Sequence, residues 1–324
     1  MTKAFISVVI PSYQAIGTIQ RAIDSVVHEN LVNKVFVMDD GSSDGTAELV
    51  KALPYSKVIF EGGVNRGACH ARNRGLHLSR DDYVLFLDAD DYVERGYIEQ
   101  FSEYLQCDPN VVIAGHRHIS VDGEQINSVS YRAGLKGWDL LAEYINNPIQ
   151  TSGFLWNRKW LVDGGGWDET LPIFQDAEIS IRMLLREPEV SIISEPKNFA
   201  VWAEHRATTR ITNNISKDKI SAMYRGLLLH KDKVIHTGNK AAVEGLAARL
   251  YELARKAYTR RFDEVGDLCM AAVRELGVPG HRGSYSHRFV SNLIGLKMKM
   301  HLAAYGRRLV GTADHTSNYN LRRK

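Results

Sequence analysis

The sequence has few cysteines and no long hydrophobic run. Its 324 residues include 3 cysteines, Cys69, Cys107 and Cys269, which are too scattered and too few for a disulfide framework or a zinc site. No run of about eighteen apolar residues occurs, and the first residues lead into an apolar strand pattern without the hydrophobic segment of a secretory leader. We therefore expect a cytoplasmic protein that is not secreted through a leader and does not span a membrane.

Two common nucleotide-binding signatures are also missing. No Gly-x-Gly-x-x-Gly follows the first predicted strand, and no Gly-x-x-x-x-Gly-Lys-Ser/Thr occurs anywhere. Their absence weighs against a dinucleotide oxidoreductase and against a P-loop NTPase. With 44% hydrophobic and 24% charged residues, the chain has an ordinary globular composition, and its length allows one sizeable core and a second unit.

The net charge of +3 hides an asymmetry. Residues 1–215 carry 20 Lys and Arg against 29 Asp and Glu, whereas residues 216–324 carry 21 against 9. The basic part raises nucleic-acid binding as a function of another class. However, its basic and aromatic residues form no recognisable motif, and the aspartates of the front part would repel phosphates unless a metal is bound. We therefore expect no nucleic-acid partner.

The front of the chain alternates strand and helix patterns. Apolar runs at residues 7–10, 34–38, 57–60 and 83–87 predict strands, and helical spacing or helix starts lie between them. Such alternation predicts an α/β fold with right-handed crossovers and a mainly parallel sheet covered on both faces. Ligands of these sheets bind beyond the carboxyl ends of the strands, where polar residues follow in this sequence.

Three of the polar segments each have two interpretations. Residues 11–13 fit a turn, or an aromatic ring that stacks on a base. Residues 39–45 fit a helix cap and loop, with Ser43 or Asp44 as the cap, or a carboxylate that accepts hydrogen bonds from a base or ribose. The arginines of residues 66–74 fit a solvated helix face, or a surface that meets a nucleotide's phosphates or base.

The most informative segment is residues 83–91, an apolar strand pattern that ends in Asp88, Asp90 and Asp91. Taken alone, it fits a solvated turn. Its carboxylates are also hard oxygen ligands of the kind that bind Mg²⁺ or Mn²⁺ carrying a diphosphate. Asp91 has two interpretations, a carboxylate that supports the ligands or the cap of a helix beginning near Glu94.

Four segments in order, residues 8–13, 39–46, 65–75 and 87–91, resemble the family 2 glycosyltransferases of the GT-A fold. The resemblance covers about the first ninety residues. It implies a Rossmann-like, nucleotide-binding α/β domain, an inverting transfer from a nucleotide-sugar donor, and a divalent metal, Mn²⁺ or Mg²⁺. We expect the donor to be a UDP-hexose. Carried over by position, Pro11, Tyr13 and Asp40 would hold the base of the donor, and Arg72 would support it.

The same resemblance supplies the metal and diphosphate site. Asp88 would contact the ribose or the metal, and Asp90 would be the main metal ligand. A basic cluster follows an expected edge strand at residues 199–202. There the resemblance suggests His205 as a further metal ligand and Arg206 or Arg210 as diphosphate contacts; a basic surface loop is the simpler interpretation.

Sugar transfer also requires a base beside the incoming hydroxyl, on the face of the donor sugar opposite the leaving group. Asp176 lies where the family carries its Glu-Asp catalytic pair, with Gln175 in place of the Glu and Glu178 where an Asp is frequent. Asp176 is therefore our candidate base, with helix capping as the alternative. Gln175 is a candidate contact to the diphosphate or acceptor.

Residues 164–169 resemble the family's Gly-Gly-Phe-Asp-Glu turn beside the acceptor. Trp167 of this turn is a candidate acceptor contact. Trp156, Trp160 and Trp167 could each stack on a sugar ring or belong to the core.

The alternation stops near residue 216. We expect a GT-A domain at residues 1–215, with a donor half at 1–105 and an acceptor half at 106–215, followed by a basic helical extension at 216–324. Helical spacing predicts helices at residues 217–236, 239–261, 263–276 and 286–310.

The last predicted helix carries an apolar stripe with basic residues outside its centre. The stripe consists of Phe289, Leu293, Leu296, Met300 and Ala303. It fits a helix packed on the protein, or one that contacts an anionic membrane surface.

Together these features predict sugar transfer to a glycan in polysaccharide synthesis. By analogy with relatives, we expect a lipid-linked oligosaccharide acceptor and a peripheral location at the inner face of the cytoplasmic membrane. A sugar-nucleotide nucleotidyltransferase is the nearest alternative, although residues 11–15 lack its glycine-rich basic loop. A non-catalytic nucleotide-sugar-binding scaffold is the third candidate.

Overall fold

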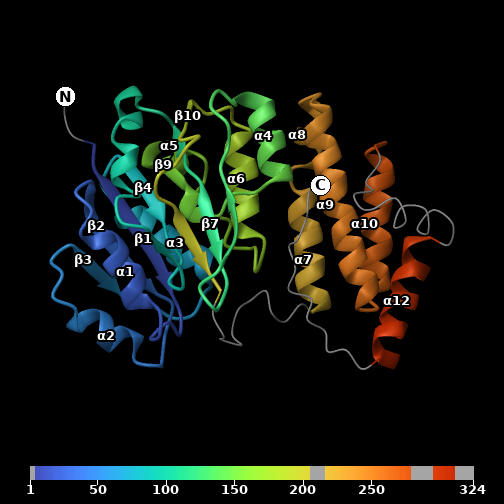
Figure 1. The fold of residues 1–324 in the computed structure, drawn as a ribbon, viewed down its shortest axis with the longest axis horizontal. Coiled ribbons are helices and arrows are strands. Elements are labelled where there is room, and N and C mark those ends of the chain that lie inside the picture. Colours follow the sequence, from blue (N-terminus) through green and yellow to red (C-terminus); the bar gives the residue numbers. More distant parts are fainter. Residues whose placement is uncertain (1–3, 205–215, 279–294, 311–324) are drawn as a thin grey trace. The chain divides into compact units, whose positions relative to one another are not determined.

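A computed structural model describes residues 4–204, 216–278 and 295–310 (Figure 1). The chain divides into two compact units, Met1–Leu246 and Ala247–Lys324. The first unit contains the α/β part, and the second is helical where it is described. The predicted domain boundary at residue 215 stays a prediction.

A seven-stranded sheet forms the centre of the first unit, in the order β10-β6-β9-β4-β1-β2-β3. β9 runs antiparallel to β4 and β6, and the other paired strands are parallel. The strands are β1 (Ile6–Ser12), β2 (Val32–Asp39), β3 (Val58–Glu61), β4 (Tyr83–Phe86), β6 (Val111–Ile113), β9 (Phe154–Asn157) and β10 (Val190–Ile192). The predicted mainly parallel α/β sheet is confirmed.

Both faces of this sheet are buried because its strands read as almost continuous apolar runs. Every residue of β1 and β4 is buried. Val8 and Val35 belong to the core cluster that also contains the apolar face of α1 (Ile19–Val27). The opposite face meets α3 (Ala68–Leu78), where a Cβ on Gly75 would lie 2.4 Å from Cγ1 of Val9. Glycine therefore lets α3 approach the sheet closely.

A short helix, α2 (Thr46–Ala52), connects β2 to β3. Its N-cap is Gly45, but Asp44 Oδ1 accepts hydrogen bonds from the amide of Thr46 at 3.1 Å and its hydroxyl at 2.6 Å. The predicted cap at Ser43 or Asp44 is therefore wrong by at least one position, although Asp44 supports the helix start through Thr46.

A second sheet has four strands in the order β5-β11-β7-β8. They are β5 (Tyr92–Val93), β11 (Ala200–Ala203), β7 (His116–Ile119) and β8 (Gln125–Val129). The prediction of an edge strand at residues 199–202 is wrong, because β11 pairs with β5 on one side and β7 on the other. A single short apolar run does not show how many partners its backbone has.

The predicted helix beginning near Glu94 is also wrong. The chain instead enters β5, and the amide of Glu94 donates to the carbonyl of Phe199 at 2.9 Å. The next residues turn at Gly96, which has a φ of +82°, and form only short 3-10 segments at Glu99–Phe101 and Tyr104–Cys107. Asp91 therefore caps no helix.

The remaining helices of the first unit follow β8. They are α4 (Gly137–Asn146), α5 (Arg158–Asp163), α6 (Gln175–Leu184), α7 (Lys217–Leu228), α8 (Lys231–His236) and the beginning of α9 (Lys240–Thr259). The single helix predicted at residues 217–236 is divided between α7 and α8. The chain turns at His230, whose buried side chain bonds to Glu178.

The second unit contains α10 (Asp263–Glu275) and α12 (Leu296–Val310). Leu296 and Met300 of the predicted stripe are buried, whereas Ala303 is exposed. Met298 and Leu302, which lie off the stripe, are more than half exposed. The first part of the predicted helix, residues 286–294, lies outside the described residues.

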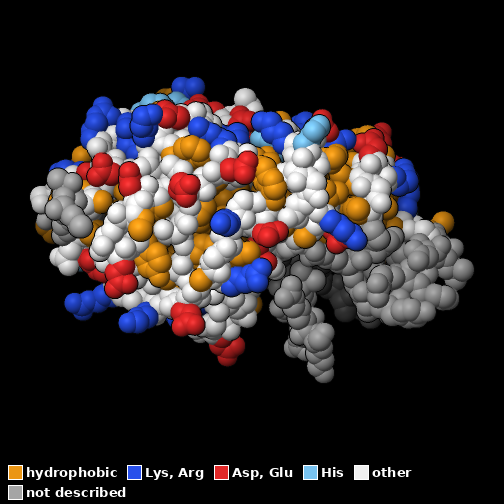
Figure 2. All heavy atoms as spheres, turned by 90° about the horizontal axis from the view of Figure 1, so that it is seen from above, with side chains coloured by type: hydrophobic (Ala, Val, Ile, Leu, Met, Phe, Trp, Pro, Cys, Tyr) orange, Lys and Arg blue, Asp and Glu red, His pale blue; other side chains and the backbone are white. Residues whose placement is uncertain are grey.

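Within the described ranges, no helix combines the length and apolarity needed to cross a membrane. Figure 2 shows one face of the molecule, on which basic and acidic side chains are intermixed with small hydrophobic patches.

Candidate functional site

The register of the sheet brings several predicted site residues to one edge. Ser12 at the end of β1 aligns with Asp39 at the end of β2. The amide of Asp40 donates to the carbonyl of Ser12 at 2.8 Å, and the amide of Leu87 donates to that of Val9 at 3.0 Å. The polar segments after β1, β2 and β4 therefore lie at neighbouring strand ends, as the sequence predicted.

The two aspartates after β2 organise this edge differently. Asp39 Oδ2 accepts the amides of Gly41 and Ser42 at 3.1 and 2.9 Å, which folds its own loop. Asp40 accepts the amides of Arg66 and Gly67 at 2.9 and 2.8 Å. Asp40 therefore joins the loop after β2 to the start of α3.

The predicted base-binding residues have different exposures. Tyr13 is 52% exposed, so its side chain is accessible to a ligand. Pro11 is buried in β1, and Asp40 is only 4% exposed. Tyr13 is thus the most accessible of these residues.

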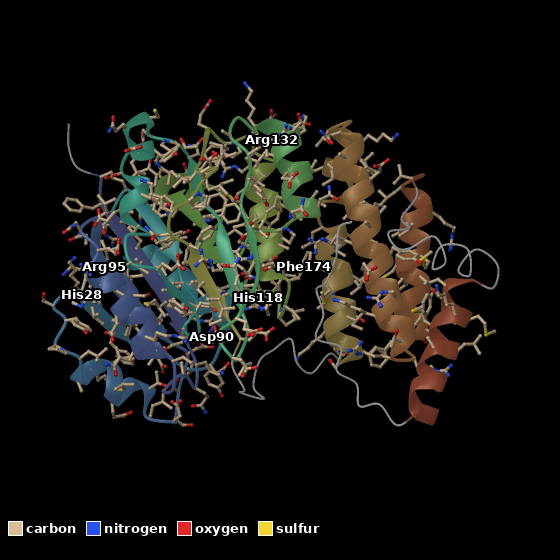
Figure 3. All side chains as sticks on the ribbon, in the orientation of Figure 1. His28, Asp90, Arg95, His118, Arg132 and Phe174 are labelled. Atoms are coloured by element: carbon tan, nitrogen blue, oxygen red, sulfur yellow. The ribbon has the colours of Figure 1, made fainter. Side chains whose placement is uncertain are left out.

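The carboxylates of Asp88, Asp90 and Asp91 form a compact cluster after β4 (Figure 3, where Asp90 is labelled). One oxygen of each lies within 4.8 Å of the others. Asp91 is buried and accepts the amide of Ala203 in β11 at 3.2 Å. Arg21 donates to the backbone carbonyl of Asp90 at 2.7 Å. Three hard oxygen donors at this spacing fit a divalent cation such as Mg²⁺ or Mn²⁺.

Arg72 lies behind this cluster and is 5% exposed. It donates to Asp88 Oδ1 at 2.7 Å and to Gln175 Oε1 at 3.0 Å, and its guanidinium lies 4.4 Å from the ring centre of Trp167. Burial alone would lower the pKa of Arg72, but the negative charges of Asp88 and Asp176 outweigh it and raise the pKa. Arg72 therefore remains a buried cation between the acidic strand end and α6.

Asp88 is under opposing influences. Burial raises its pKa, as do the neighbouring carboxylates Asp176 and Asp90, and Arg72 offsets these effects only in part. The ionised form of Asp88 is therefore less favourable here than in water, and a further positive charge nearby would favour it.

Asp176 lies in the first turn of α6. Its charge raises the pKa values of both Arg72 and Asp88, so the structure places it in the electrostatic environment of the acidic cluster. The hydroxyl of Tyr144 donates to the backbone carbonyl of Asp176 at 3.2 Å. Neighbouring Gln175 donates to the carbonyl of Leu171 at 2.8 Å and accepts from Arg72.

Glu178 has a different environment from Asp176. It is 3% exposed and accepts hydrogen bonds from Arg182 Nε at 2.6 Å and Arg182 Nη2 at 3.0 Å, while His230 Nε2 lies 3.0 Å from its Oε1. Burial would raise the pKa of Glu178, but the bonds from His230 and Arg182 lower it overall. Its oxygens are therefore committed to buried partners, which favours Asp176 as the candidate base.

Two predicted contact residues are buried in the interior, and three further predicted residues cannot be placed. Trp167 is 2% exposed and packs beneath Arg72 and against Phe86, so it supports the site from the interior. Trp156 is 1% exposed and belongs to the core. The basic cluster of His205, Arg206 and Arg210 lies outside the described residues.

Sequence reasoning missed several residues that hold the site together. Asn73 accepts the amide of Trp167 at 2.8 Å and donates to its carbonyl at 2.9 Å, which attaches the glycine-rich turn to α3. Arg21 and His230 were also overlooked. Asn73 lies within a motif-bearing stretch and could have been flagged, but nothing local distinguishes Arg21 or His230 from ordinary helix residues.

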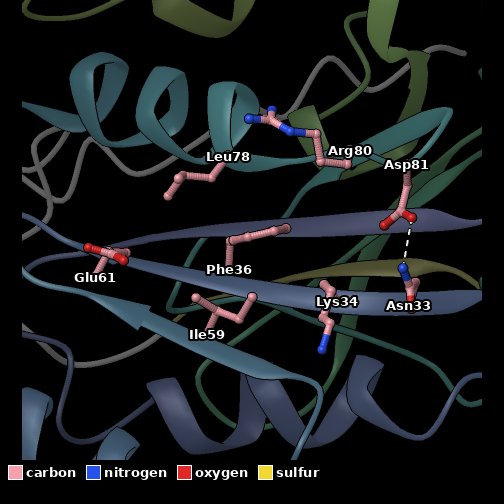
Figure 4. Close-up of a pocket in the computed structure, with 8 residues that line it drawn as sticks. All are labelled: Asn33, Lys34, Phe36, Ile59, Glu61, Leu78, Arg80 and Asp81. Carbon is pink, nitrogen blue, oxygen red and sulfur yellow. Dashed lines mark hydrogen bonds between the residues drawn. The ribbon is translucent and has the colours of Figure 1, made fainter.

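A separate pocket of about 360 Å³ lies away from this edge (Figure 4). Its wall consists of residues from β2, β3, the end of α3 and the segment between α3 and β4: Asn33, Lys34, Phe36, Ile59, Glu61, Leu78, Arg80 and Asp81. Asn33 donates to Asp81 at 2.8 Å across one end. None of the predicted site residues belongs to this wall.

Known proteins are similar to this chain in sequence and in fold. A match to the "Glycosyl transferase family 2" model covers residues 7–161. "Glycosyltransferase GlyA" of Streptococcus pneumoniae is 31% identical over 97 residues, 29% of this chain and 14% of that protein. "Poly-beta-1,6-N-acetyl-D-glucosamine synthase" of Staphylococcus aureus is 29% identical over 192 residues, 56% of this chain and 46% of that protein. The chain thus spans less than half the length of these relatives.

The fold comparison extends further along the chain. The crystal structure of S. aureus TarS 1-349 in complex with UDP-GlcNAc matches with a TM-score of 0.68 and 16% identity, over 96% of this chain and 93% of that chain. At this identity the likeness shows the fold. The expected GT-A architecture is confirmed, and residues 7–161 match the glycosyl transferase family 2 model.

Proposed function

We propose that this chain is a metal-dependent, inverting glycosyltransferase that moves a sugar from a nucleotide-sugar to a hydroxyl of a glycan. The observation that carries the proposal is the position of Arg72, which bonds both Asp88 of the acidic cluster and Gln175 beside Asp176. A cation-binding edge and a candidate base therefore share one buried guanidinium. Such a site supplies charge stabilisation and a proton acceptor together.

A UDP-sugar is the favoured donor. The exposed side chain of Tyr13 offers a stacking surface for a base. Pro11, Asp40 and Arg72 as further contacts to the donor stay proposals from the sequence. The TarS structure contains UDP-GlcNAc, and a relative is named for poly-N-acetyl-D-glucosamine synthesis. UDP-GlcNAc is therefore the first donor to test.

Asp90 and Asp88 would hold the divalent cation, with Asp91 fixed behind them by Ala203. When bound, Mn²⁺ or Mg²⁺ would neutralise negative charge on the departing diphosphate. His205 as a further ligand, and Arg206 or Arg210 as diphosphate contacts, stay proposals from the sequence.

Asp176 would act as the general base. Its carboxylate takes the proton of the acceptor hydroxyl while that oxygen forms a bond to the anomeric carbon. The bond from this carbon to the diphosphate breaks on the opposite face, and its electron pair leaves with the nucleoside diphosphate. Attack opposite the leaving group inverts the anomeric configuration.

The proposed acceptor is a lipid-linked oligosaccharide at the inner face of the cytoplasmic membrane. Support comes from the named role of a relative in polysaccharide synthesis and from the exposed apolar residues Met298 and Leu302 among lysines of α12. These side chains offer a small amphipathic surface for anionic lipid.

A donor screen tests the proposal directly. UDP-, GDP- and dTDP-sugars are compared by thermal shift with Mn²⁺, because ligand binding raises the melting temperature. The best donor is then assayed for nucleoside diphosphate release with and without Mn²⁺. Binding without turnover on any acceptor would indicate a scaffold. Pyrophosphate release from a sugar 1-phosphate and a nucleoside triphosphate would indicate a nucleotidyltransferase.

A further inference from the structure

The residue before α6 has an unusual backbone. Phe174, labelled in Figure 3, is the N-cap of α6 and has φ and ψ angles of 70° and 19°, in the left-handed region. A bulky side chain rarely adopts this conformation unless its surroundings enforce it. Because Phe174 precedes Gln175 and Asp176 directly, whatever holds Phe174 also sets the direction of the candidate base.

The Phe174 ring lies close to the backbone of α7 at Gly226. Gly226 lies inside α7 and is buried, and a Cβ placed on it would lie 2.8 Å from Cδ1 of Phe174. Glycine is unfavourable within a helix because it has no side chain to restrict the unfolded backbone. Its occurrence here is explained by the close approach of the ring.

A second contact comes from the turn between α7 and α8. His230 is 9% exposed, and its Nε2 lies 3.0 Å from Oε1 of Glu178, two residues after Asp176. Arg182 bonds the same carboxylate and donates to the carbonyl of Gly166 at 2.6 Å. The first turn of α6 is thus tied to α7, to the α7–α8 turn and to the glycine-rich turn.

We propose that Gly226 and His230 are positioning residues for Asp176, so that the segment from Lys217 to His236 helps to orient the candidate base. This proposal rests on the proposed function. Gly226 seats Phe174 in its left-handed conformation, and His230 fixes Glu178. The family match ends at residue 161, so these contributions come from outside the matched region.

Kinetics of the full chain test the two contacts. Gly226→Ala should lower kcat at least about tenfold and leave the Kd for UDP with Mn²⁺ within about twofold, because the added methyl displaces Phe174 and not the donor site. In a Phe174→Ala background, the same Gly226 change should have little further effect on kcat. Gly17→Ala is the control, since a Cβ there meets nothing within 4 Å.

The second pair of variants separates positioning from general packing. His230→Gln keeps an N–H donor toward Glu178 and should retain kcat within about threefold, whereas His230→Leu should lose at least about tenfold. Equal losses in both, or additive losses for Gly226→Ala with Phe174→Ala, would overturn the proposal.

Amide hydrogen exchange gives a readout that does not depend on activity. Gly226→Ala and His230→Leu should accelerate exchange in the peptide covering residues 174–184, with the strands β1 and β4 unchanged. Unaltered exchange in this peptide would show that Gly226 and His230 do not hold the start of α6. If the wild-type chain showed no turnover but the variants showed this local acceleration, the proposed function would be wrong. The structural role of Gly226 and His230 at the start of α6 would still be supported.

Discussion

Arg72 donates a hydrogen bond to Asp88 at 2.7 Å from a position that is almost fully buried. The pair connects α3 to the end of β4, and the same guanidinium reaches Gln175. A buried cation requires a partner, and a partly buried carboxylate requires one as well. The pair therefore fixes the distance between the donor edge of the sheet and α6.

Replacing Arg72 with Met should destabilise the protein by about 2 kcal/mol, because Asp88 is left without its cation. Chemical denaturation measures this change. The double variant Arg72→Met with Asp88→Asn should be more stable than Arg72→Met alone, since no unpaired charge remains. A double variant that is less stable than either single one would contradict the pairing.

His116 should make the free energy of unfolding sensitive to acid. Burial, with a smaller effect of neighbouring His118, lowers its pKa to about 4. The unfolded chain takes up this proton near the ordinary value of about 6.5, so stability is complete above that pH and falls as the pH drops toward 4. Between these two pH values, the His116 proton should lower the free energy of unfolding by roughly 3 kcal/mol.

His116→Gln should therefore flatten the dependence of the unfolding free energy on pH between about 6.5 and 4. The exposed His77 provides the control, because His77→Gln should leave the slope unchanged. An unaltered slope in His116→Gln would show that other groups cause the acid sensitivity.

The three cysteines should differ sharply in reactivity. Burial raises the pKa of both Cys69 and Cys269 to about 12, whereas Cys107 is exposed. Since the thiolate is the nucleophile, iodoacetamide at pH 8 should modify Cys107 alone in the folded protein and all three thiols in denaturant. Mass spectrometry of tryptic peptides checks this. Rapid labelling of Cys69 in the folded chain would be inconsistent with its burial in α3.

The proposed membrane contact of α12 has its own test. Met298→Glu together with Leu302→Glu should reduce binding of the full chain to phosphatidylserine vesicles about tenfold or more, because both exposed side chains would leave the lipid interface. Ile126→Glu, a similar change at an exposed residue of β8, should bind as the wild type does. If both proteins bind equally in a flotation assay, α12 makes no lipid contact.

Much of the fold could be predicted because the first four strands are short apolar runs followed by polar residues. The strand predicted at 83–87 appears as β4, and the helix expected after residue 67 appears as α3. The edge position of β11 and the helix near Glu94 were wrong for one reason. Both depend on which distant strands pair, and β5, β7 and β11 meet only through long-range contacts.

The residues of the candidate site also divide into those that the sequence predicts and those that it does not. Asp40, Asp88 and Asp90 follow strands directly, so the parallel sheet brings them to one edge. The support for Asp176 could not be predicted, because Gly226 and His230 belong to a helical segment with no recognisable motif. Their importance follows from side-chain contacts that sequence spacing does not encode.

The most direct test of the central claim compares wild type with Asp176→Asn in steady-state transfer from the best donor and in binding of UDP with Mn²⁺. Loss of the base should lower kcat by about 10²–10⁴-fold while the Kd for UDP stays within about twofold. A variant that retains wild-type kcat would contradict Asp176 as the base and, with it, the proposed mechanism.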